Sequence, residues 1–207
     1  MFAVTNTVTG AAIPAPNTPY SQGPLEPALQ GKIIPFEFVP VAPVTAQSLS
    51  ITTDGPSFIH SGWGNDTIID NSRIPGDVVI DPGRGTNTIQ ASSNPTSHDT
   101  IIVDVEPDPE STPQERSAPL IDTITGLKAG DNVLIKGLTL PPTAFMALVS
   151  SAPGTPLTLT IPPPTGPAQI VLSGYTSSDL GGRLIIDAPF VSTNPDVSSY
   201  DLIRVLG

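Results

Sequence analysis

The chain contains no cysteine, so neither disulfide bonds nor thiolate metal sites can hold its fold, and its redox compartment cannot be read from cysteine usage. Aromatic residues make up only 5% of the sequence and charged residues only 13%. Lys and Arg number 8 against 19 Asp and Glu, which gives a net charge of −11. Because such a chain repels nucleic-acid phosphates instead of neutralising them, we expect no nucleic-acid partner.

Long hydrophobic runs are also missing. No apolar stretch approaches the roughly 18 residues that a membrane-spanning helix needs, so no membrane span is predicted. Residues 1–5 lack the basic and apolar regions of a Sec signal peptide. We therefore expect a protein that is soluble or exported by another route.

Motifs of enzyme chemistry are absent as well. The sequence has no H-E-x-x-H zinc motif, no G-x-S-x-G nucleophile elbow and no glycine-rich nucleotide loop. Its two histidines, His60 and His98, could lie on related edges of a repeating fold, but each is more simply a turn residue with one hydrogen bond. The sequence predicts no enzyme.

Proline and glycine, by contrast, are abundant, with 26 and 18 residues. Proline removes a backbone donor and glycine costs conformational entropy inside a helix, so a chain this rich in both cannot be mostly helical. We predict an all-β fold with many turns.

One stretch carries the clearest motif. Residues 61–69, S-G-W-G-N-D-T-I-I, fit the nine-residue pattern G-G-x-G-x-D-x-U-x, with U apolar, at every defined position except the first, which is Ser61. In such a nonapeptide, glycines allow positive φ angles, carbonyls and the aspartate face a calcium ion, and the apolar residue begins an inward-pointing strand.

A unit of Asp or Asn, any residue, and an apolar residue then recurs, beginning at Asp66, Asp77, Asn87 and Asp99 with spacings of 11, 10 and 12 residues. Two such half-turns make a coil of about 21 residues, which predicts a small β-solenoid. Its core is expected to contain Ile59, Ile69, Ile80, Ile89 and Ile102, with Phe58, Ile68, Val78 and Ile101 beside them.

Over roughly residues 58–135 the sequence resembles the RTX, or hemolysin-type calcium-binding, β-roll family. Gly62, Gly64, Asp66 and Ile68 carry the resemblance, and it continues more weakly on Gly83, Gly85, Asn87 and Ile89, where Pro82 replaces a motif glycine and Asn87 the aspartate. The resemblance implies calcium as a cofactor, with the candidate ligands Gly62, Gly64, Asp66, Asp77 and Asp81. The alternative is that the glycines only make tight turns, which Asn65 and Asp66 cap.

These observations predict four parts. Residues 1–46 form an extended proline-rich arm, residues 47–105 an RTX-like β-roll or β-solenoid, residues 106–117 an acidic proline-rich linker, and residues 118–207 a C-terminal β-domain. Residues 143–150 are the only stretch for which a helical turn or two is expected.

The expected function is structural and non-catalytic, in an extracellular or particle assembly such as a surface layer, an appendage or a phage-like virion. Its partners would be subunits of that assembly or copies of the chain itself. A second hypothesis is a calcium-binding, adhesin-like protein that is exported by the type I route. A third is a β-solenoid enzyme acting on polysaccharides with Asp66, Asp70, Asp77 and Asp81 on one face.

Overall fold

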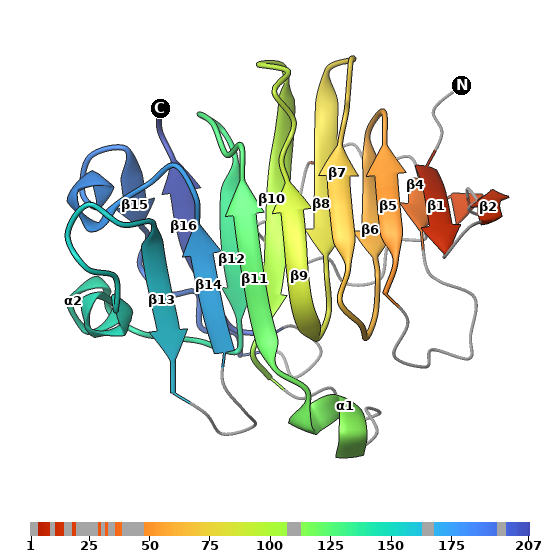
Figure 1. The fold of residues 1–207 in the computed structure, drawn as a ribbon. Coiled ribbons are helices and arrows are strands. Elements are labelled where there is room, and N and C mark those ends of the chain that lie inside the picture. Colours follow the sequence, from red (N-terminus) through yellow and green to blue (C-terminus); the bar gives the residue numbers. More distant parts are fainter. Residues whose placement is uncertain are drawn as a thin grey trace.

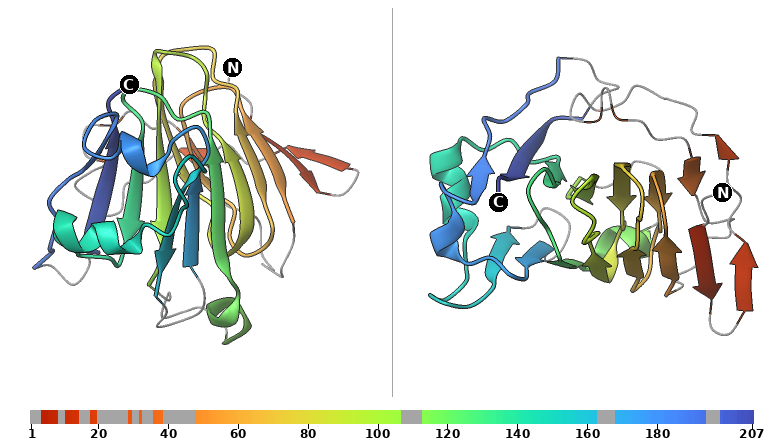
Figure 2. Two further views of the ribbon diagram at one scale, coloured as in Figure 1. Left: turned by 60° about the vertical axis from the view of Figure 1, so that its left-hand side comes forward. Right: turned by 90° about the horizontal axis from the view of Figure 1, so that it is seen from above.

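The computed structural model describes residues 48–106, 113–162, 168–193 and 198–207, together with the short stretches 4–8, 11–14, 18–19, 29, 32 and 36–38. This part of the chain is largely β-strand, and its strands form two sheets that face each other (Figures 1 and 2). The first sheet contains, in spatial order, β13 (Leu157–Ile161), β14 (Ala168–Leu172), β11 (Leu120–Thr125), β9 (Gly85–Gln90), β7 (Thr67–Asp70), β5 (Ser50–Thr53), β1 (Val4–Val8) and β2 (Ala11–Pro14). The second contains β15 (Leu184–Ile186), β16 (Tyr200–Val205), β12 (Asn132–Lys136), β10 (Ser97–Asp104), β8 (Gly76–Asp81), β6 (Ser57–His60), β4 (Phe36–Phe38) and β3 (Thr18–Pro19).

Between β5 and β12 the chain alternates between the two sheets. Each strand in this stretch pairs in parallel with the strand that comes two later in the sequence. Three of these pairs join residues 21 positions apart, as in the pairing of Thr67 with Thr88. This is the spacing that the recurring Asp or Asn unit predicts.

The prediction of a short β-roll or β-solenoid followed by a separate C-terminal β-domain is wrong. Beyond the parallel strands, β13, β15 and β16 join the same two sheets in antiparallel pairs, so the protein is a two-layer sandwich of mixed sheets. The last parallel strands would otherwise expose unpaired backbone groups, and the strands that follow satisfy them.

The extended N-terminal arm is also corrected. The described parts of residues 1–46 include strands that extend both sheets, with β1 pairing with β5 and β4 with β6. Leu29 is buried against the outer face of the second sheet, and Lys32 Nζ lies 2.9 Å from Asp77 Oδ1. The other residues of the predicted arm lie outside the described residues. The boundaries of the four predicted parts stay predictions.

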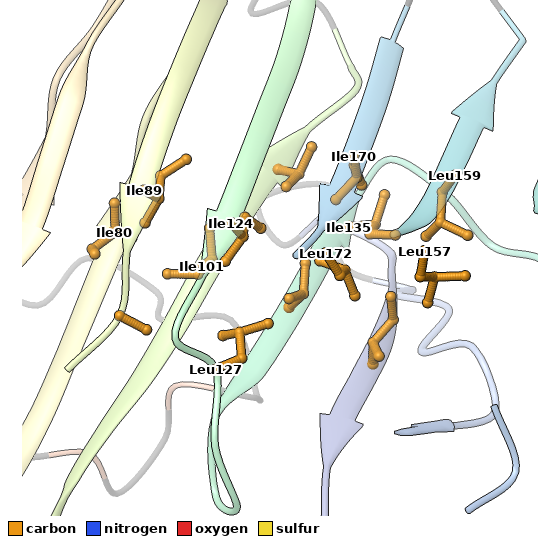
Figure 3. Packing of buried hydrophobic residues seen from close by; sticks show 14 of the residues in the cluster. Ile80, Ile89, Ile101, Ile124, Leu127, Ile135, Leu157, Leu159, Ile170 and Leu172 are labelled. Atoms are coloured by element: carbon orange, nitrogen blue, oxygen red, sulfur yellow. The ribbon is translucent and has the colours of Figure 1, made fainter. Parts of the chain in front are cut away.

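The main core fills the space between the sheets, where apolar side chains from both sheets meet (Figure 3). Ile59, Ile80 and Ile89 lie there as expected, but Ile69 and Ile102 do not. Because side chains alternate between the faces of a strand, their neighbours Ile68 and Ile101 point inward in their place. A second apolar cluster lies on the outer face of the second sheet and contains Leu29, Phe58, Val79, Ile102, Leu134 and Tyr200.

Helices are few and short. α2 (Pro142–Phe145) and the 3₁₀ turn Met146–Leu148 confirm the expected helical turns, and the fully buried Phe145 joins them to the core. Two more pieces were not expected from the sequence, α1 (Pro113–Ser117), within the predicted linker, and the 3₁₀ turn Ser177–Asp179.

Candidate functional site

The predicted glycine turn lies where the chain passes from the second sheet to the first, and it stacks on residues 82–87. Gly64 N donates to Arg84 O at 2.9 Å, and Arg84 N donates to Gly62 O at 3.1 Å. A Cβ on Gly85, whose φ is +143°, would lie 1.4 Å from Gly64 O. The close approach of the two turns therefore requires glycine at this position.

A buried row of polar side chains crosses the first sheet beside this turn. It consists of Asp66, Asn87 and Asp122, and we call it the polar ladder. Asp66 Oδ1 accepts a hydrogen bond from Leu49 N at 2.8 Å, and Asn87 Oδ1 accepts one from Asp66 N at 3.0 Å. Asn87 Nδ2 donates to Asp122 Oδ1 at 2.9 Å. Each side chain of the ladder thus bonds to the neighbouring segment of the sheet.

The strand period explains why these polar residues are buried. Each lies two positions before an interior isoleucine, which is Ile68, Ile89 or Ile124, and residues two apart on a strand share a face. A polar group that is forced inward in this way needs a hydrogen-bond partner to offset its desolvation. The ladder supplies such partners from one strand to the next.

Two ladder oxygens remain without a partner in the described part of the chain, Oδ2 of Asp66 and Oδ2 of Asp122. The pKa of Asp122 is raised to about 7, mainly by burial. The hydrogen bond from Asn87 lowers this pKa, and the negative charges of Asp81 and Asp66 raise it. Burial also raises the pKa of Asp66, which the facing Ser61 hydroxyl and Leu49 N–H lower in part. The carboxyl groups of Asp66 and Asp122 therefore favour protonation or a bound cation.

The five predicted calcium ligands do not all meet. Gly62, Gly64 and Asp66 belong to the turn, and Asp81 lies beside it, where its Oδ1 accepts a hydrogen bond from Gly83 N at 3.1 Å. Asp77 lies four residues before Asp81 on β8, about 13 Å away at the rise of a strand. One ion therefore cannot contact both Asp77 and Asp81.

The residues present fit a calcium ion only in part. The unpartnered oxygens of Asp66 and Asp122 are each suitable ligands, but they lie two strand spacings apart, about 10 Å, so one ion cannot contact both. The Asn87 amide nitrogen, however, already donates to the Pro82 and Gly83 carbonyls at 3.5 and 3.3 Å, oxygens that a cation could otherwise use. Within the described residues, no three His, Asp or Glu side chains form a metal-binding group.

The two histidines are not brought together. His60 pairs with Asp81 at one end of β8, stacks on Phe58 at 4.0 Å between ring centroids, and has its Nδ1 3.4 Å from Asp81 Oδ2. His98 pairs with Asp77 at the other end of β8. The length of a strand also separates Asp66, which directly precedes β7, from Asp70, which is its last residue. The four aspartates of the polysaccharide hypothesis therefore do not gather at one point.

A second acidic cluster, not expected from the sequence, lies at the opposite end of the sandwich and contains Asp70, Asp99, Asp131 and Lys128. Asp131 Oδ1 accepts a hydrogen bond from Asp99 N at 2.8 Å, and Lys128 Nζ lies 3.0 Å from the same oxygen and 3.4 Å from Asp99 Oδ2. Burial, together with the charges of Asp70 and Asp131, raises the pKa of Asp99 well above its ordinary value. Burial raises the pKa of Asp131 as well.

One signal in the sequence could have located both clusters. The tripeptide Asp-Thr-Ile occurs at Asp66, Asp99 and Asp122, and in each case the aspartate is buried and bonds to a neighbouring strand or loop. The ladder partners Asn87 and Asp122 are 35 residues apart instead of 21, and the insertion of residues 106–117 accounts for 12 of the 14 extra positions. This insertion hides the repeat.

Within the described part of the chain, no helix is both long and apolar enough to cross a membrane. Comparison with known proteins found no matching family model, no similar curated protein and no similar solved structure. The resemblance to the RTX family therefore stays a prediction that rests on the residues of the glycine turns.

Proposed function

We propose that the protein is a non-catalytic structural component of an extracellular or particle assembly, such as a surface layer, an appendage or a phage-like virion. The observation that carries this proposal is the polar ladder. Each side chain of the ladder forms a hydrogen bond to a neighbouring strand or segment, so the ladder holds adjacent strands of the first sheet together. These hydrogen bonds hold neighbouring strands in register, which suits a load-bearing body.

The sheet ends support protein subunits as partners. The first sheet ends on β2 and β13 and the second on β3 and β15, and the outer edge of β13 is already in part paired, because Val149 lies opposite Leu159 and Ser150 N donates to Thr158 O at 2.9 Å. The outer edge of β15 is also in part paired, at Leu184. The edges offered to a partner are therefore those of β2 and β3. Terminal strands present backbone groups that a strand from another subunit can pair with. Copies of this chain, or other subunits of the assembly, would join there.

Calcium belongs to the proposal as a stiffening ligand at the glycine turns. The support is the buried, unpartnered oxygen of Asp122 beside the glycine turns, and burial and the nearby carboxylate of Asp81 raise the pKa of this group. Burial disfavours the ionised form of the Asp122 carboxyl group, and a divalent cation there would neutralise its charge. At pH 8, calcium is expected to raise the urea midpoint of the native chain but not that of Asp122→Asn. Asp77→Asn, whose carboxylate lies at the other end of β8, should keep the calcium effect.

The deciding experiment is the mass of the purified native protein by light scattering, with calcium and then with excess chelator. We expect a large or self-assembling species under both conditions. A well-behaved monomer under both conditions would refute the assembly role.

The second candidate is a secreted, adhesin-like calcium-binding protein that acts alone. The raised pKa of Asp122 favours it, because a chain with costly buried carboxylates gains folding free energy when a cation binds. A monomer that unfolds when calcium is withdrawn would select this candidate over the first.

A further inference from the structure

The outer face of the first sheet carries a regular row of side chains, five of the six with a hydroxyl group. On β5, β7, β9, β11, β14 and β13, the inward positions fill the core and every second residue points outward. The register of these strands places one outward residue of each in a single row, Ser50, Thr67, Thr88, Thr123, Val171 and Thr158. We call this row and the outward residues beside it the threonine face.

The threonine face has no charge. No outward position on these six strands is Asp, Glu, Lys or Arg, and the outward positions beside the row are Thr52, Ile69, Thr86, Gln90, Ile121, Thr125, Gln169 and Thr160. The chain as a whole has a net charge of −11. Charged residues ordinarily concentrate on water-facing surfaces, so their exclusion from a whole sheet face needs a specific explanation.

The hydroxyls at the centre of the face are available to water. Within the described part of the chain, the side chains of Thr67, Thr88 and Thr123 make no hydrogen bond to protein, and Thr67 and Thr88 are exposed. Threonine is β-branched and therefore stiff about χ1, so the strands repeat its hydroxyl and methyl groups at fixed intervals. These intervals are about 4.8 Å across the strands and about 6.6 Å along them.

The polar ladder lies directly beneath this row. Thr67, Thr88 and Thr123 each follow a ladder residue in the sequence, so the inner hydrogen bonds fix the register of the outer threonines. Figure 1 looks onto this face: β5, β7, β9 and β11 lie side by side, and no described helix lies across them. Over β7, β9 and β11 the array is thus regular, and no helix of the described residues covers it.

We propose that the threonine face binds the surface of crystalline water, that is, ice. A rigid lattice of methyl and hydroxyl groups restricts the first water layer to fixed positions, which can merge with the water layers of a crystal. Charged side chains would hold water in shells that do not match a lattice, which explains their exclusion. This inference goes beyond the structural role proposed above and does not depend on it.

Other occupants fit less well. A stable protein interface has an apolar centre, whereas the middle of this face carries the hydroxyls of Thr67, Thr88 and Thr123, so a second copy is poorly matched. A sugar polymer would stack on aromatic rings, and none of the outward positions on these six strands is aromatic.

The test is incorporation of the full chain into ice grown slowly from dilute solution, measured as protein in the ice fraction against protein in the liquid. The native protein should be enriched in ice, and Thr88→Lys at the centre of the face should remove the enrichment. Ser93→Lys makes the same charge change in the exposed loop between β9 and β10 and should preserve it. Urea unfolding of each variant verifies the fold.

Native protein that enters ice no more than an inert globular protein would overturn the proposal, as would a Thr88→Lys variant that matches Ser93→Lys. If Thr88→Lys does not fold, Thr123→Val, which keeps the shape and removes a hydroxyl, should lower the enrichment, and an unchanged value overturns the proposal. Binding to a crystalline polysaccharide in place of ice, or a dimer that Thr88→Lys disrupts, would also overturn it. The amount of protein that enters ice does not bear on the light-scattering test of the structural role.

Discussion

Asp122→Asn tests the polar ladder because it changes one buried charge and almost no shape. The Asp122 side chain is fully buried, and its Oδ1 accepts the hydrogen bond from Asn87 Nδ2 at 2.9 Å. An asparagine oxygen can accept the same bond. The substitution therefore removes the ability to ionise while leaving the ladder connected.

The magnitude follows from the pKa of Asp122, which burial raises from 3.8 to about 7. A carboxyl group with a raised folded pKa contributes its full stability below the unfolded pKa and loses it as the pH rises through the folded one. The shift corresponds to about 4 kcal/mol lost by the native protein between pH 4 and pH 8. Asparagine cannot ionise, so the variant avoids this loss.

The assay is urea unfolding of both proteins at pH 4, 6 and 8, with the free energy of unfolding taken at constant m-value. The stability of Asp122→Asn relative to the native protein should grow with pH, by up to about 4 kcal/mol at pH 8. Asp77→Asn removes a negative charge from a partly exposed ion pair and serves as the control for net charge. A difference between Asp122→Asn and the native protein that does not change with pH would refute a protonated Asp122.

Three further substitutions test other parts of the fold. Gly85→Ala should destabilise the protein strongly in thermal unfolding, because its Cβ would meet a carbonyl oxygen at 1.4 Å, whereas Gly154→Ala, with φ +79° and open space, should cost only about 1 kcal/mol. Leu29→Ala should cost about 2–5 kcal/mol in urea unfolding, since this buried side chain covers the outer face of the second sheet, and no measurable loss would contradict that packing. Asn87→Asp should lower the urea midpoint at pH 8, and calcium should raise this midpoint by more than it raises the native one. A midpoint that does not change with calcium would count against a cation at the ladder.

The local parts of the fold could be predicted from the sequence. Glycine turns and the recurring Asp or Asn unit are short-range signals, and they located the strands from β7 to β10 and their 21-residue spacing. Which of two adjacent apolar residues points inward was harder. Ile68 and Ile69 are both isoleucine, and only the pairing of the whole strand decides that Ile68 is buried.

The long-range parts could not be predicted. β16 lies beside β12 although more than sixty residues separate them in the sequence, because β12 had a free edge and β16 an apolar face to bury. Hydrophobic patterning identifies such a strand but not the edge it joins. The same limit applies to the second acidic cluster, since Asp99 and Asp131 become neighbours only through the pairing of β10 with β12.

Asn87 shows why a departure from a motif can be a structural requirement. Strands in a sheet lie about 4.8 Å apart, so an aspartate at position 87 would place three carboxylates in one buried column between Asp66 and Asp122. Like charges at that distance in a poorly solvated interior repel strongly. The amide separates the two carboxylates by two strand spacings, about 10 Å, and gives Asp122 a hydrogen-bond donor. Asn87 thus reduces the repulsion between buried carboxylates without a bound ion. A cation would have this effect if all three positions were aspartate.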